Sequence, residues 1–375
     1  MSLRVALLSY RGKEHCGGQG VYIRHLSREL VALGHRVEVI AGPPYPVVDA
    51  GVRLTRVPAL DLYAEPNPFR TPGLDELRRL PDWIEFAGMR SGRFTEPLAF
   101  STRVRRYLAS RRFDVVHDNQ SLGYGLLGLG IPTVATVHHP VTVDRDLKPG
   151  SERWYSFTRM QSRVARRLPR ILTVSSASRA EIVSRMGVAA ERIRVVPLAA
   201  DPDFRPGKPV PGRIVCVASS HDPIKGLRYL LTAFEQLRRQ RECELVVIGR
   251  AEPASGVTFV SNLPAEEYAS LVSSAEIMCV PSLFEGFSLP AAEAMSCGIP
   301  VVATTGGALP EVVGDAGVLV PPGDPTALAR ALRDLLDDPG RRATLGQRGI
   351  ARSGRLSWGR TAGETADCYQ ELLTC

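Results

Sequence analysis

The stretch Phe284-Glu-Gly-Phe-Ser-Leu-Pro-Ala-Ala-Glu-Ala-Met295 predicts a tight loop and the start of a helix, and it follows a predicted strand that ends at Pro281. Ser288 is a good N-cap, and Pro290 would fall in the first helical turn, where its missing N–H costs little. Glu285 would then lie in the loop ahead of the helix. Glu293 would lie about one turn inside it.

This arrangement suits a ligand that carries a phosphate between two hydroxyl-bearing rings. The loop and first turn contribute the amide N–H groups of Gly286, Phe287, Ser288 and Leu289. They lie at the positive end of the helix dipole and can bind phosphate oxygens, while each carboxylate accepts hydrogen bonds from a diol. The alternative is that Glu285 is a surface residue and that Glu293 only compensates for the dipole.

Short apolar runs alternate with helical patterns along both halves of the chain. A segment with five prolines, 197–212, separates the halves and is the best candidate for a linker. Continuous apolar runs such as Leu3–Ser9 and Pro132–His138 are typical of parallel strands that are covered on both faces. The pattern predicts an α/β protein with two doubly wound sheets facing across a cleft, in which ligands bind beyond the carboxyl ends of the strands.

Three further segments lie at or just after the carboxyl ends of predicted strands. They are Cys16-Gly-Gly-Gln-Gly20, Thr136-Val-His-His-Pro140 and Asp222-Pro-Ile-Lys-Gly226. Glycines let a backbone approach a ligand, His138 can donate a hydrogen bond to a ligand oxygen, and Lys225 can reach a phosphate. A tight turn, and a surface lysine at a helix start, are the plainer interpretations of the first and last segments.

Composition predicts a soluble protein of two domains. The 375 residues are 44% hydrophobic and 23% charged, and no uncharged stretch has the character of a membrane span. The seven cysteines include no CxxC pair, which favours reduced thiols and a cytoplasmic location and argues against a zinc site.

Charge is distributed unevenly. Residues 1–200 contain 30 Lys and Arg against 18 Asp and Glu, a net charge of +12. Because the whole chain has a net charge of +8, residues 201–375 have a net charge of −4. The segment 153–168 has the pattern of an amphipathic helix with a cationic face. A basic first half fits an anionic acceptor or the inner face of an anionic membrane, or it is simply a solvated surface. No nucleic-acid-binding motif accompanies the charge.

The segment Glu285–Val302 resembles the EGFGLPxxEAMACGxPVV signature of glycosyltransferase family 4, which contains the E-x7-E motif of retaining enzymes. Other family segments are matched by Gly17-Gly18, Lys225-Gly226, Gly306-Gly-Ala-Leu-Pro-Glu311 and the last helix from Ser357 to Tyr369. The resemblance extends over nearly the whole chain.

The resemblance implies a GT-B fold. Residues 1–198 together with about 358–375 would form an acceptor-side domain, and residues 199–357 a domain that binds a nucleotide-sugar donor. Glu285 would hold sugar hydroxyls, Glu293 the ribose diol, and Lys225 the diphosphate. From the first domain, Gly17, Gly18 and His138 would approach the sugar. No metal or other cofactor is implied, and Asp144-Arg-Asp146 is interpreted as incidental.

One departure from the family pattern concerns the phosphate site. The family usually has an arginine five or six residues before the lysine, where this chain has Ser219 and Ser220. Ser220 would then be a neutral donor contact, and Arg250 is the expected replacement cation. Arg11 and His221 are further candidates.

The predicted function is the metal-independent transfer of a sugar from a UDP-sugar or GDP-mannose to an unidentified, anionic or lipid-linked acceptor, with retention by a front-face mechanism. A nucleotide-sugar epimerase of similar shape is one alternative. A non-catalytic protein that binds a nucleotide sugar is another, because of the missing arginine.

Overall fold

The computed structural model describes residues 2–12, 18–62, 70–147, 150–219 and 222–374. The chain divides into two compact units. The first unit comprises Met1–Val174, Ser178–Val196 and Trp358–Cys375, and the second comprises Ser175–Ala177 and Pro197–Ser357. The main division at Pro197 falls at the beginning of the proline-rich segment.

Seven strands among the described residues form the parallel sheet of the first unit, in the order β3-β2-β1-β4-β5-β6-β7. They are β1 (Arg4–Ser9), β2 (Arg36–Ala41), β3 (Arg53–Arg56), β4 (Val115–Asn119), β5 (Thr133–Val137), β6 (Arg170–Thr173) and β7 (Ile193–Val195). All five residues of β4 and of β5 are buried, as predicted for strands covered on both faces.

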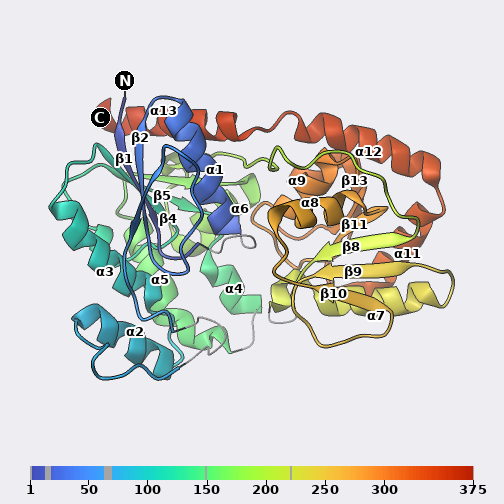
Figure 1. Cartoon of the computed structure of the whole chain (residues 1–375), viewed down its shortest axis with the longest axis horizontal. Coiled ribbons are helices and arrows are strands. Elements are labelled where there is room, and N and C mark those ends of the chain that lie inside the picture. Colours follow the sequence, from blue (N-terminus) through green and yellow to red (C-terminus); the bar gives the residue numbers. More distant parts are fainter. Residues whose placement is uncertain (1, 13–17, 63–69, 148–149, 220–221, 375) are drawn as a thin grey trace. The chain divides into compact units, whose positions relative to one another are not determined.

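Helices cover both faces of this sheet (Figure 1). Those that lie wholly in the first unit are α1 (Gly18–Ala32), α2 (Leu80–Arg90), α3 (Glu96–Ala109), α4 (Val141–Leu147), α5 (Tyr155–Ala165) and α13 (Trp358–Thr374). The C-terminal helix α13 lies beside α1, and the ring of Trp358 stacks on that of His25 with centroids 4.8 Å apart. Helix α6 (Ser176–Glu181) follows β6.

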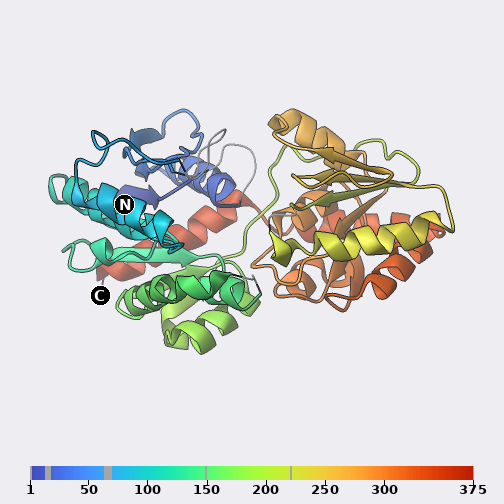
Figure 2. The ribbon, with the colours of Figure 1, turned by 90° about the horizontal axis from the view of Figure 1, so that it is seen from below.

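The second unit repeats this architecture, with helices on both faces of a parallel sheet (Figure 2). Its described strands, in the order β10-β9-β8-β11-β12-β13, are β8 (Arg213–Val217), β9 (Glu244–Ile248), β10 (Val257–Val260), β11 (Ile277–Val280), β12 (Val301–Thr304) and β13 (Gly317–Val320). Its helices are α7 (Leu227–Arg238), α8 (Ala265–Ser273), α9 (Leu289–Ser296), α10 (Leu309–Val313), α11 (Pro325–Leu336) and α12 (Pro339–Ser353). No described helix combines the length and the apolar character that a membrane span requires.

Both sheets reverse their strand order at one place, between β1 and β4 in the first unit and between β8 and β11 in the second. Ligands of doubly wound sheets bind beyond the carboxyl ends of the strands at this switch point. In the second unit these two ends lead into the segments that contain Lys225 and Glu285. In the first unit β4 ends at Asn119, and His138 follows the adjacent strand β5.

The proline-rich segment 41–95 differs in one respect from what its sequence predicts. The sequence pattern favours a helix at Leu74–Leu80, but the helix that the structure describes within this segment is α2, at Leu80–Arg90. It begins there because Asp82 accepts a hydrogen bond from the N–H of Arg79 at 2.8 Å and Pro81 occupies the first turn.

Candidate functional site

Neighbouring strands of the second unit bring Lys225 and Glu285 together at one edge of the sheet. Lys225 ends a short 3-10 turn after β8, and Glu285 lies in the loop after β11. The ammonium nitrogen Nζ of Lys225 lies 2.8 Å from Oε1 of Glu285, and the hydroxyl of Ser282 donates to the same oxygen at 2.7 Å. Glu285 is only 8% exposed, so its carboxylate is fixed by these two donors.

The pKa of Lys225 is affected in opposite directions by burial and by its partner. Burial lowers the pKa of the lysine, but the attraction and hydrogen bond of Glu285 outweigh this effect, so the pKa lies above its ordinary value. Lys225 therefore carries a positive charge at neutral pH.

A close approach of two loops makes this pairing possible. The N–H of Leu283 donates to the carbonyl of Ile224 at 2.7 Å. Gly226 has φ +67°, and a Cβ atom there would lie 2.0 Å from the carbonyl oxygen of Pro281. Only glycine fits this position, which explains why glycine follows the lysine.

The segment that begins at Gly306 supports Glu285 from behind. The N–H of Ala308 donates to the Glu285 carbonyl at 2.9 Å. A Cβ atom on Gly307 would lie 2.3 Å from the same carbonyl oxygen. This close packing explains why glycines occupy positions 306 and 307 beside the site.

Helix α9 begins after Ser288, as the sequence predicts, and Pro290 lies in its first turn. The prediction that the Ser288 side chain caps this helix is wrong, because the residue has φ +83° and its side chain makes no cap hydrogen bond. Phe287, just before it, is buried. The first turn of any helix leaves N–H groups unpaired, and here they lie between Glu285 and Glu293 in the chain.

Glu293 lies inside α9 and is 4% exposed. The hydroxyl of Tyr268, on α8, donates to its Oε2 at 2.6 Å, and the ring of Phe204 packs edge-on against Tyr268 with centroids 5.5 Å apart. Burial raises the pKa of Glu293 to about 7. The charge of Asp201 acts in the same direction, and the hydrogen bond from Tyr268 acts in the opposite direction. Tyr268 and Phe204 carried no signal in the sequence, since Tyr268 lies on α8 and Phe204 in the segment between β7 and β8.

In the first unit, His138 is held by the end of the neighbouring strand. Its ring nitrogen Nε2 lies 2.8 Å from Oδ1 of Asn119, and its backbone N–H donates to Oε1 of Gln120 at 2.8 Å. The His138 ring packs edge-on against the ring of Tyr22, with centroids 4.8 Å apart. Burial, with a smaller contribution from His139, lowers the pKa of His138 to about 3. Asn119 and Gln120 were missed, although their place at a strand's carboxyl end was a usable signal.

The other predicted residues are placed as follows. Gly17 and Ser220, like His221, lie outside the described residues. Gly18 is the exposed first residue of α1, and Arg250 is exposed after β9. The Arg250 carbonyl accepts a hydrogen bond from the Ser219 hydroxyl at 2.8 Å.

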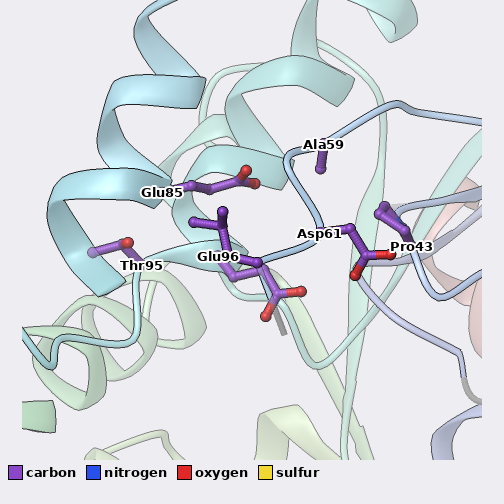
Figure 3. Close-up of a pocket in the computed structure, with 7 residues that line it drawn as sticks. Pro43, Ala59, Asp61, Glu85, Thr95 and Glu96 are labelled. Atoms are coloured by element: carbon purple, nitrogen blue, oxygen red, sulfur yellow. The ribbon is translucent and has the colours of Figure 1, made fainter. Parts of the chain in front are cut away.

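Arg11 lies at a different site of the first unit, where it forms an ion pair with Glu96. Glu96 lines a small pocket with Asp61, Glu85 and other residues (Figure 3). Burial raises the pKa of Glu96 to about 7, opposed chiefly by Arg11. The structure thus gives Arg11 a partner within the first unit.

Helix α5 has the amphipathic character that the sequence predicts, with Phe157, Met160 and Val164 buried. The helix borders a groove of about 470 Å³. The groove is lined by Phe94, Thr95, Leu98, Tyr124, Tyr155, Ser156, Phe157, Arg159, Met160 and Arg163. Arg159 and Arg163 have no carboxylate partner among the described residues, so the groove carries uncompensated positive charge.

Two family models match the chain. The model described as Glycosyltransferase Family 4 matches residues 16–204, and the model described as Glycosyl transferases group 1 matches residues 211–338. The chain belongs to glycosyltransferase family 4. The predicted enzyme class, a hexosyltransferase, is confirmed by this membership and by the relatives that follow.

A relative from Mycolicibacterium hassiacum, named MMP alpha-(1->4)-mannosyltransferase, is 48% identical to this glycosyltransferase, over 99% of this chain and 98% of the relative. A D-inositol 3-phosphate glycosyltransferase from Xylanimonas cellulosilytica is 32% identical, over 99% and 95% of the two chains.

Among solved structures, sucrose-phosphate synthase from Thermosynechococcus elongatus matches with a TM-score of 0.79 at 23% identity, over 99% of each chain. Anabaena HepE, solved in complex with UDP and glucose, matches with a TM-score of 0.72 at 18% identity, over 98% of this chain and 99% of HepE. These neighbours confirm the predicted GT-B fold with its two Rossmann-like sheets.

Proposed function

We propose that this glycosyltransferase is a retaining mannosyltransferase whose donor is a nucleoside-diphosphate mannose, with GDP-mannose as the first candidate. The observation that carries the proposal is the Lys225–Glu285 pair, which lies just ahead of helix α9 with Glu293 inside that helix. The mannosyl group is supported by the 48% identical relative, which is named a mannosyltransferase.

The donor would bind along this segment of the second unit. Its diphosphate meets the first-turn amides of α9 and the ammonium of Lys225, which together supply positive charge. Glu293 accepts hydrogen bonds from the ribose diol, and Glu285 from the sugar. The family resemblance also assigns His138 and Gly18 to the sugar.

The reaction follows from these contacts. An acceptor hydroxyl oxygen forms a bond to the anomeric carbon on the face from which the phosphate oxygen departs, and the hydroxyl proton passes to that departing oxygen. The α linkage in the relative's name equals the configuration of an α-linked mannosyl donor, which supports retention. Catalysis then consists of positioning and of stabilising the charge on the leaving diphosphate.

Lys225 and the N-terminus of α9 would take the place of a metal ion as the positive charge that balances the leaving group. Transfer should therefore proceed at an unchanged rate after dialysis against a chelator. A loss that added magnesium or manganese restores would contradict this part of the proposal.

The acceptor side is proposed to include the groove beside α5. Exposed Tyr124 and Tyr155 offer rings on which a sugar can stack, and Arg159 and Arg163 offer positive charge to an anionic group. An acceptor on an anionic membrane would add a peripheral attachment. Sedimentation with vesicles that contain or lack anionic lipid tests this attachment. Equal fractions of protein sedimenting with both kinds of vesicle would rule the attachment out.

A binding screen followed by a product assay tests the function. GDP, UDP and ADP are compared for the rise in melting temperature that a bound ligand causes, and GDP should give the largest rise. The matching mannose donor should then give a glycosidic product. Free nucleoside diphosphate without any acceptor product would indicate the epimerase, and donor binding without turnover the non-catalytic protein.

A further inference from the structure

Ser288 has an unusual backbone for its residue type. Its φ of +83° lies in the region that normally belongs to glycine, and helix α9 begins directly after it. A side chain in such a conformation costs on the order of 1–3 kcal/mol, and residues of this kind cluster at ligand-binding sites. The surrounding loop therefore holds Ser288 in this position against a local preference.

The hydroxyl of Ser288 is also unusual, because it is buried without a partner. The residue is 4% exposed, and Oγ has no hydrogen-bond partner in the part of the chain that the structure describes. Nearby serines differ in this respect, since Ser282 donates to Glu285 and Ser296 donates to the carbonyl of Glu293. A buried hydroxyl that makes no hydrogen bond is unfavourable, and a ligand at this place would remove the cost.

The position of this hydroxyl selects the ligand chemistry. It precedes the eight-residue helix α9, whose N-terminus attracts negative charge. It also lies three residues after Glu285, whose partner Lys225 is a cation. A hydroxyl donates one hydrogen bond, and phosphate oxygens can only accept.

We propose that the Ser288 hydroxyl donates a hydrogen bond to a phosphate oxygen of the nucleoside-diphosphate donor. This inference rests on the proposed function and deepens it.

Calorimetric titration with GDP and with UDP tests the proposal on the wild-type protein and on two variants. Ser288→Ala removes the hydroxyl and keeps the strained backbone, whereas Ser288→Gly removes both. If the hydroxyl binds phosphate, both variants should bind the diphosphate roughly ten- to a hundredfold more weakly, the range for a hydrogen bond to a charged group. Ser288→Gly should nevertheless melt at a higher temperature than Ser288→Ala, because glycine relieves the strain.

Two controls separate a direct contact from a disturbed helix. Ser296→Ala, at the other end of α9, removes a hydroxyl that has its own partner and should leave the affinity unchanged. The penalty for a 2′-deoxy nucleotide, which reports on Glu293 inside α9, should be the same in Ser288→Ala as in the wild type.

Wild-type affinity in both Ser288 variants would overturn the inference and leave the proposed function intact. A lost 2′-deoxy penalty would also overturn it, since the helix itself would then have moved. If the wild-type protein bound neither diphosphate, the proposed function would fail and this inference with it.

Discussion

The ammonium of Lys225 and the carboxylate of Glu285 form an ion pair at 2.8 Å, so the cation that we assign to the donor's diphosphate is already paired with a carboxylate of the same site. A bound diphosphate must share Lys225 with Glu285 or replace it. Under the proposed function, Glu285 opposes binding of the diphosphate product and accepts hydrogen bonds from the sugar.

Glu285→Gln should separate binding from transfer. The variant removes a negative charge that competes for Lys225, so GDP should bind at least as tightly as to the wild type. Transfer should fall by roughly 10²–10³-fold, the scale on which single electrostatic contacts act in catalysis. Lys225→Ala should instead lose both GDP binding and transfer. Equal loss of GDP affinity in both variants would argue against the competition.

Donor affinity should depend on pH through Glu293. Its pKa of about 7 means that the carboxylate needed for the ribose diol forms only as the pH rises through neutrality. Affinity for the nucleotide sugar should therefore rise from pH 5.5 to pH 8.5, by up to about tenfold per unit below the pKa. Titration at several pH values measures this, and Glu293→Gln should flatten the profile. A flat wild-type profile would refute the assignment.

The same carboxyl group should destabilise the fold at alkaline pH. Its pKa in the folded protein lies above the ordinary 4.5, so the stability it contributes is complete below pH 4.5 and is lost as the pH rises through 7. Glu293→Gln, which cannot ionise, should gain on the order of 3 kcal/mol relative to wild type between pH 4 and pH 8. Chemical denaturation at both pH values measures the change, and a constant difference would be the contrary result.

His138 should stay neutral across the physiological range. Burial lowers the pKa of its imidazole to about 3, and Asn119 occupies one ring nitrogen. Its ring proton signals, assigned by comparison with His138→Gln, should not shift in NMR spectra between pH 5 and pH 8. A midpoint near 6.5, the ordinary histidine value, would show that the ring is solvated.

Gly226 should be intolerant of any side chain. Alanine there would place Cβ 2.0 Å from the Pro281 carbonyl oxygen with φ at +67°, so Gly226→Ala should lower the free energy of unfolding by about 2–4 kcal/mol and weaken GDP binding. Gly363→Ala is the matched control, because Gly363 lies in helix α13 and a Cβ atom there would have no heavy atom within 4 Å. It should stabilise by about 0.5–1 kcal/mol. Equal effects would mean that the two loops are not closely packed.

Local patterns predicted the parts of the site that lie at the carboxyl ends of the strands. The spacing of Glu285 and Glu293 follows from the helix that begins between them, and the meeting of Lys225 with Glu285 follows from the shared edge of parallel strands. Contacts that depend on how helices and loops pack against one another were not predictable in this way. Tyr268 reaches Glu293 only because α8 packs beside α9, with Phe204 packed against its ring.

Residue preference alone misled the interpretation of Ser288. Serine before a proline-containing first turn is a good N-cap, but the backbone at Ser288 has φ +83°, and its side chain does not cap α9. The misplaced helix of the 41–95 segment has a similar origin, since a capping interaction between Arg79 and Asp82 decided where α2 begins.

A crystal structure of the protein with a bound nucleoside diphosphate tests the central claim most directly. The account predicts phosphate oxygens within hydrogen-bonding distance of Lys225 Nζ and of the Ser288 hydroxyl, with the ribose hydroxyls on the Glu293 carboxylate. A diphosphate bound elsewhere, or a ribose that leaves Glu293 with Tyr268 as its sole partner, would contradict it.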